Sequence, residues 1–238
     1  RKAHIGQRIE HTSRIVVDGR KVRLKSASTT DVIVLNKRIG TVSTRSDEKG
    51  RVTIYKNLPK PPHGRWVSVG RLDINTSGLI LLTNNGELAN RMMHPSSGVD
   101  KEYAVRVGGR LSDEELETLR KGVEVDGAQI KFSDIQFFGG TNRNNWYHVV
   151  LMDGKNREVR NLFEYVGFSV SRLKRVRFGP VVLPSSLKVG QHLVLSEEDT
   201  QALCSFFGVV YKSGATPIKR KSEKSNKSIL IPYPGLDF

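Results

Sequence analysis

Short apolar segments separated by turn residues run through the chain, and they restrict it to a fold rich in β-strands. Asp-Gly pairs at 126–127 and 153–154 are turn signals between such segments. Many strands with few helices predict an α+β protein with a mostly antiparallel sheet, and no internal repeat is visible. The predicted strands cover residues 31–36, 67–69, 79–82, 102–107, 123–125, 130–132, 147–151 and 193–195.

Three helices are predicted between these strands. Ser112 and Glu115 form a capping box at the start of one helix, which Gly122 ends. Ser196 caps a second helix with an acidic first turn. The third helix covers 156–166, and its buried stripe has the spacing i, i+3, i+4, i+7: Val159, Leu162, Phe163 and Val166.

Composition shifts divide the chain into three parts. Residues 1–27 form a small β segment, in which Asp18-Gly19 favours a type I′ hairpin. Residues 31–210 form the main domain. Residues 211–238 are predicted to be a flexible tail, in which six Lys and Arg face two acids. This tail either lies along phosphates or is a solvated terminus.

The charge balance favours a polyanionic partner. The 238 residues hold 39 Lys and Arg against 24 Asp and Glu, which gives a net charge of +15 and a pI near 10.1. Such an excess suits a polyanion better than a small neutral substrate. The alternative is a charge that serves solubility alone.

Cysteine usage and apolar run lengths limit the class of protein further. A single cysteine, Cys204, excludes a disulfide framework and a Cys-rich zinc site, and it favours a reducing cytoplasm. The apolar runs are too short to cross a bilayer, and no signal peptide is visible. Because the chain begins at Arg1 rather than methionine, we expect an N-terminal portion to precede it.

One polar loop is the main candidate for chemistry. Familiar catalytic motifs are absent from the sequence: the nucleophile elbow, the zinc-binding H-E-x-x-H, the P-loop and the G-x-G-x-x-G fingerprint. The six histidines show no metal-ligand spacing, so no metal site is expected. Asp73 lies in a loop bracketed by Gly70 and Gly78 and followed by an apolar strand. Loops held this way often carry function, although a lone Asp there is more often a turn residue.

Three motifs in order resemble the pseudouridine synthases, specifically the branch that modifies ribosomal RNA. The string G-R-L-D-x-x-T-S-G-L begins at Gly70 within a likeness over 70–94, K-x-Y follows at 101–103, and a glycine–arginine motif covers 154–160. The resemblance extends over residues 31–208 and implies the fold of that family, a mixed and mostly antiparallel sheet with flanking helices. It also implies that residues 1–27 are the end of an S4-like RNA-binding domain.

Within that branch, the chain is most similar to enzymes of the large ribosomal subunit. The likeness rests on Met93-His94-Pro95-Ser96 and on the segments 145–147 and 171–177. Three positions depart from the family pattern: Arg38 replaces a proline, Lys155 an arginine and Asn161 a third arginine. The first departure bears on a loop near the site, and the other two reduce the expected grip on phosphate.

The resemblance implies an rRNA pseudouridine synthase that needs no cofactor and isomerises a uridine of 23S rRNA after base flipping. It implies Asp73 as the essential carboxylate, Arg160 as its partner and Tyr103 as the residue that stacks on uracil. Two other functions stay open: the same reaction on small-subunit rRNA or tRNA, and a non-catalytic RNA-binding protein of ribosome assembly. A cytoplasmic monomer without membrane contact is expected.

Basic residues near the site are predicted to contact RNA phosphates. Arg71 precedes the aspartate, and the others cluster where acids are few: Lys155, Arg157, Arg172, Lys174, Arg175 and Arg177. The alternative is a solvated charged face. Trp146 and Tyr147 either stack on a base or fill the core.

Overall fold

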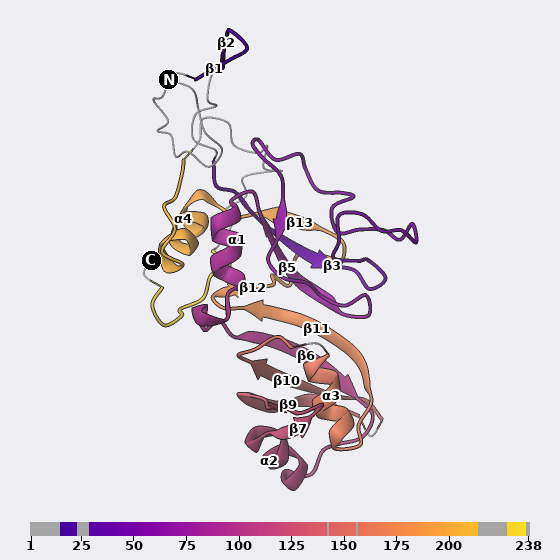
Figure 1. The fold of residues 1–238 in the computed structure, drawn as a ribbon. Coiled ribbons are helices and arrows are strands. Elements are labelled where there is room, and N and C mark those ends of the chain that lie inside the picture. Colours follow the sequence, from indigo (N-terminus) through magenta and orange to yellow (C-terminus); the bar gives the residue numbers. More distant parts are fainter. Residues whose placement is uncertain (1–14, 23–28, 142, 156, 214–227, 237–238) are drawn as a thin grey trace.

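The computed structural model describes residues 15–22, 29–141, 143–155, 157–213 and 228–236. The order of strands along the chain and the helices between them give the α+β architecture that the sequence predicts (Figure 1). Among the described residues, no helix combines the length and apolar character required to cross a membrane.

A nine-stranded sheet forms the centre of the molecule. Its main path runs β13-β3-β5-β11-β6-β10-β9, with β12 paired to β11 and β4 paired to β5. Every pairing is antiparallel except that of β5 with β11, so the predicted mixed, mostly antiparallel sheet is confirmed. The strands are β3 (Val32–Lys37), β4 (Val67–Ser68), β5 (Ser77–Thr83), β6 (Lys101–Val107), β9 (Asp134–Gly140), β10 (Asn145–Leu151), β11 (Val170–Phe178), β12 (Val181–Val182) and β13 (His192–Val194).

Within the described residues, four α-helices flank this sheet: α1 (Gly86–Met93), α2 (Asp113–Lys121), α3 (Glu158–Tyr165) and α4 (Glu197–Phe206), with a short 3-10 helix over Pro95–Ser97. The capping box of Ser112 and Glu115 and the cap by Ser196 are both confirmed. α3 begins later than predicted, after Arg157, which adopts a left-handed conformation and caps nothing with its side chain. α1, capped by Asn85, was not among the predicted helices.

The helices divide between the two faces of the sheet. Leu119 of α2 and Val159, Leu162 and Phe163 of α3 join one apolar core. Residues of α1 and α4, among them Leu88 and Leu203, join a second core. Figure 1 shows α1 and α4 near β3 and β5, and α2 and α3 near β6, β10 and β9. The first core also contains the side chains that form the floor of the candidate site.

The parallel contact between β5 and β11 joins the two halves of the sheet. Its register comprises two pairs, Lys174 with Ser77 and Arg175 with Gly78. Gly78 has φ +100°, and a Cβ there would overlap the carbonyl oxygen of Arg175. Glycine at this position therefore lets the two strands approach each other.

In the part of the chain that the structure describes, two hairpins lie outside the nine-stranded sheet. β1 (Ile15–Val17) and β2 (Arg20–Val22) are joined by Asp18 at φ 49° and Gly19 at φ 74°, which confirms the predicted hairpin at this turn. β7 (Val123–Val125) and β8 (Ala128–Ile130) form the second hairpin. The strand predicted over 130–132 is therefore displaced, because β8 ends at Ile130. Most of the predicted S4-like segment lies outside the described residues.

The C-terminal segment 228–236 corrects the prediction of one flexible tail from 211 onward. Leu230 forms a bridge with Val181, and Leu230 and Leu236 are both buried in the second core. The hydroxyl of Tyr233 donates a hydrogen bond to Asp100 Oδ1 at 2.8 Å. Apolar side chains within the basic tail therefore fix this part of it to the domain, while residues 214–227 lie outside the described residues.

Candidate active site

A pocket of about 520 Å³ brings together most of the residues that the sequence motifs single out, although Arg160 is not among those that line it. The loop before β5 contributes Arg71 and Asp73, β6 contributes Tyr103, and the segment before α3 contributes Lys155 and Arg157. These segments lie far apart in the chain and meet because the central strands carry them to one face of the sheet.

Asp73 presents an exposed carboxylate from a loop whose backbone is held firmly. Its carbonyl oxygen accepts hydrogen bonds from Thr76 N and from Lys37 Nζ, both at 3.0 Å. Within the described residues, the carboxylate itself forms neither an ion pair nor a hydrogen bond with another side chain. The backbone of the loop is therefore fixed, while its charged oxygens face the pocket and solvent.

Lys37 is the main anchor of this loop, and the sequence analysis missed it. It is 1% exposed, and its Nζ donates to the carbonyls of Arg38 at 3.2 Å, Asp73 at 3.0 Å and Thr76 at 2.8 Å. Burial lowers the pKa of Lys37 from 10.5 to about 8, against the opposing effect of the Asp73 charge. Ile33 and Leu35 on the inward side of β3 predict an apolar residue at position 37, and a lysine stands there instead. This break in the apolar alternation is the sequence signal that could have identified Lys37.

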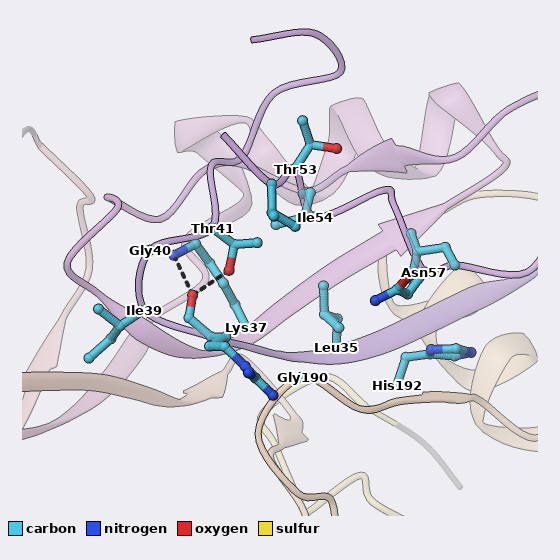
Figure 2. Close-up of a pocket in the computed structure, with 13 residues that line it drawn as sticks. Leu35, Lys37, Ile39, Gly40, Thr41, Thr53, Ile54, Asn57, Gly190 and His192 are labelled. Carbon is cyan, nitrogen blue, oxygen red and sulfur yellow. Dashed lines mark hydrogen bonds between the residues drawn. The ribbon is translucent and has the colours of Figure 1, made fainter. Parts of the chain in front are cut away.

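A second cavity, of about 360 Å³, borders Lys37 on β3 (Figure 2). Leu35 and Ile54 form part of its lining, together with His192 of β13. The Arg38 carbonyl, which accepts from Lys37, also accepts from Thr41 Oγ1 at 2.5 Å. Lys37 therefore lies between this cavity and the Asp73 loop.

Arg160 lies beside the Asp73 loop without pairing with its carboxylate. Its Nη1 donates to the Val170 carbonyl at 2.9 Å and its Nη2 to the Asn75 carbonyl at 3.2 Å. Burial and then the charge of Arg157 lower the pKa of Arg160, whereas the nearby charge of Asp73 opposes this change. The guanidinium is thus close enough to interact with Asp73 electrostatically, but its direct contacts are backbone oxygens.

Tyr103 forms part of the floor of the pocket. It is 8% exposed and lies in β6, where it pairs with Val149 of β10 and Arg175 of β11. Its side chain belongs to the apolar core on the face of α2 and α3, together with Leu72 and Leu173. One part of the ring therefore packs in the core while another lines the pocket.

The cations at the pocket differ in how they are held. Lys155 Nζ donates to the Gln129 carbonyl at 3.1 Å, and Arg157 lies 3.4 Å from Glu164 in an exposed ion pair. Glu158, which the sequence analysis did not select, is 5% exposed at the pocket wall and accepts from Lys155 N at 2.9 Å. Burial raises the pKa of the Glu158 carboxyl.

The four cations of β11 do not join this pocket. Arg172 and Lys174 alternate with Leu173, a pocket-lining residue, and so lie on the opposite face of the sheet. Arg175 is 4% exposed, and its Nε donates to the Leu79 carbonyl at 2.7 Å. The prediction that Arg175 contacts RNA is therefore wrong, because the side chain is enclosed beside the contact between β5 and β11.

Arg177 also departs from the prediction of a phosphate contact. It forms ion pairs with Asp100 at 2.7 Å and Glu102 at 2.9 Å, and its side chain is 13% exposed. These two carboxylates satisfy the guanidinium internally.

Among the described residues, no group of three His, Cys, Asp or Glu side chains could hold a metal ion.

The fold and this pocket together define the class of protein. Residues 31–165 match the family model of RNA pseudouridylate synthase, and the chain belongs to that family. A crystal structure of a pseudouridylate synthase is similar to it, with a TM-score of 0.64, 26% sequence identity and coverage of 83% of each chain.

Named relatives narrow the likeness to enzymes of the large subunit. The chain is 47% identical to ribosomal large subunit pseudouridine synthase B of Pseudomonas aeruginosa, over 97% of this chain and 61% of the relative. It is also 47% identical to the synthase B of Escherichia coli (strain K12), over 79% of this chain and 66% of the relative. The chain thus spans somewhat less than two thirds of the length of these curated relatives.

Proposed function

We propose that this chain isomerises a uridine of 23S rRNA to pseudouridine, with the carboxylate of Asp73 as the catalytic group. In this reaction the N1–C1′ bond breaks, the uracil rotates and a C5–C1′ bond forms. The proton on C5 leaves, and N1 gains a proton. Because substrate and product are isomers, the reaction requires no oxidant, reductant or net hydrolysis.

One observation carries the proposal: an exposed carboxylate on a rigidly held loop faces a pocket that a tyrosine and several cations line. A catalytic carboxylate must be accessible to the nucleotide, and Asp73 is exposed at the pocket. In this proposal Tyr103, which lines the pocket, stacks on the flipped uracil and assists removal of the C5 proton. Arg160 holds the loop through the Asn75 carbonyl and stabilises the negative charge of Asp73 electrostatically.

The pocket cations are assigned to the RNA backbone. Arg71, Lys155 and Arg157 line the pocket mouth and offset the cost of flipping the target base by contacting phosphates beside it. Unstacking a base costs about a few kcal/mol, which a small number of phosphate contacts offsets. Large-subunit rRNA is chosen as the substrate because the named relatives are large-subunit synthases.

The decisive experiment is Asp73→Asn assayed on 23S rRNA fragments that carry tritium at C5 of uridine. Wild type should release tritium to water, whereas the variant should retain RNA affinity and release none. Asp126→Asn, in the exposed turn between β7 and β8, is the matched control and should be fully active. Tritium release by Asp73→Asn at the wild-type rate would refute the mechanism.

The same assay separates the alternatives. Tritium release from small-subunit rRNA or tRNA, with none from 23S rRNA, would identify that other RNA as the substrate. RNA binding without release from any of them would indicate a non-catalytic assembly protein. We further propose a cytoplasmic monomer in which residues 1–27 end an S4-like RNA-binding domain and residues 31–210 form the catalytic domain.

A further inference from the structure

The face of β9, β10, β6 and β11 that turns away from the pocket carries an ordered set of side chains. Strand register places Trp146 of β10, Arg106 of β6 and Arg172 of β11 in one row across the sheet. The next row on this face contains His148, Ala104 and Lys174. α2 and α3 pack on the other face of these strands, where Val105, Tyr147 and Leu173 point.

The first row places two like charges directly opposite each other. Arg106 and Arg172 are cross-strand partners, an arrangement that is unfavourable unless an anion compensates it. Among the described ion pairs, none includes Arg106, Arg172 or Lys174. Arg106 Nε donates to Ser171 Oγ at 3.0 Å, which orients its guanidinium on the face.

In another row of the same face, an arginine is neutralised by acidic side chains of the protein itself. There Arg177 is the cross-strand partner of Glu102 and pairs with it at 2.9 Å. Glu102 Oε1 also lies 2.7 Å from His148 Nδ1. Acidic side chains thus neutralise Arg177 at this end of the strands. Arg106 and Arg172 in the first row have no such acidic partner among the described ion pairs.

Aromatic rings lie beside these uncompensated cations. Trp146 is half-buried next to Arg106. A bulge in β9 leaves Phe138 outside the register with β10, so its side chain is 74% exposed and its ring centroid lies 4.6 Å from that of His148. Stacking surfaces next to uncompensated guanidinium groups are the combination that binds single-stranded nucleic acid.

We propose that this basic–aromatic face, formed by Arg106, Phe138, Trp146, Arg172 and Lys174, binds a single-stranded segment of RNA. Its cations contact phosphates, and its rings stack on bases. Because Tyr103 and the pocket lie on the other face of the sheet, the face binds nucleotides other than the target uridine. The inference rests on the proposed function for the choice of RNA as the polyanion.

The test measures binding of a fluorescein-labelled 12-nucleotide oligoadenylate, which contains no uridine, over a range of salt concentrations. Each phosphate contact on a single strand contributes about 0.7 to the slope of log K against log salt, so R106Q/R172Q should flatten this slope by about 1.4. Extrapolated from 1 M to 0.1 M salt, that change corresponds to about 25-fold weaker binding. R91Q/K188Q removes two exposed charges elsewhere and should lose much less affinity.

Tryptophan emission provides a second readout that reports position. The chain has two tryptophans, and Trp66 is 4% exposed in the core, so oligoadenylate that stacks on the face should quench Trp146. Trp146→Phe should abolish this quenching while the protein stays folded. R106Q/R172Q should melt no lower than wild type, because it removes the repulsion between the two arginines.

Unchanged affinity and salt slope in R106Q/R172Q, or quenching that persists in Trp146→Phe, would overturn the proposal. Competition by poly-glutamate as strong as that by RNA would also overturn it, in favour of an acidic protein partner. Because oligoadenylate contains no uridine, its binding is independent of isomerisation. Absence of tritium release from uridine-labelled rRNA would therefore refute the proposed function and leave this inference standing.

Discussion

Replacing Lys37 with methionine separates the anchoring of the Asp73 loop from the stability of the whole fold. Methionine fills a similar volume but donates no hydrogen bond to the three carbonyls that Nζ contacts. Three hydrogen bonds from a charged donor, at the lower end of their range, contribute about 4.5 kcal/mol. Lowering the lysine pKa from 10.5 to about 8 corresponds to a cost of about 3 kcal/mol for keeping the buried amine charged.

These opposing contributions leave a net stabilisation of about 1 kcal/mol, so Lys37→Met should shift the urea unfolding midpoint only slightly. The catalytic effect should be much larger, because the loop loses its anchor and a displacement of about 1 Å at the reacting group costs about 100-fold in rate. We expect kcat in the tritium-release assay to fall about 10- to 100-fold, with RNA affinity little changed.

The control for this experiment is Lys188→Met, which removes an exposed lysine whose side chain makes no described contact. It should leave both kcat and the unfolding midpoint unchanged. A Lys37→Met variant with wild-type kcat would refute the role of the anchor. A loss of several kcal/mol in global stability would show instead that the three carbonyl contacts outweigh the cost of burying the charge by far more than about 1 kcal/mol.

Two predictions concern the sheet itself. Gly78→Ala should lose at least about 3 kcal/mol of unfolding free energy in urea, because its Cβ would overlap the Arg175 backbone. The control is Gly86→Ala, where a Cβ meets open space, and it should not lose this stability. Arg177→Met should lose about 2 kcal/mol at pH 7, because it takes the guanidinium partner from two partly buried carboxylates, which keep only Tyr233 and His148. Burial opposes ionisation of both carboxyls, but their hydrogen bonds and the Arg177 charge lower each pKa on balance. The stability gained from that pairing is present above the ordinary carboxyl pKa and is lost as the pH falls below about 4.5, so urea midpoints should converge in acid. Equal differences between wild type and Arg177→Met at pH 7 and pH 3 would contradict this account.

Apolar periodicity predicted the elements in which neighbouring residues determine the structure. Val159, Leu162 and Phe163 of the α3 stripe and the apolar run of β5 are buried as expected, whereas Val166 is half-buried just after the helix ends. β11 was missed because cations interrupt its apolar pattern, and sequence spacing does not distinguish an arginine facing solvent from one enclosed by a neighbouring strand. Arg175 and Arg177 were assigned to RNA for that reason.

The candidate site shows the same division. The motif around Asp73 and the pattern at Tyr103 and Lys155 identified residues that the fold brings to one pocket. Lys37 escaped detection because its partners lie 36 and 39 residues along the chain, and only the pairing of β3 with β5 brings them within reach. The split of the cationic cluster between two faces likewise depends on the register of β11 with β6.

The short parallel contact of β5 with β11 has a mechanical consequence for the pocket. Asp73 enters the pocket on the side of β5, whereas Tyr103 enters it on the side of β11 and β6. Only two residue pairs, at Gly78 and its neighbour, join the strands that carry these two sides of the site. The separation between Asp73 and Tyr103 therefore depends on the twist between β5 and β11 at these two pairs.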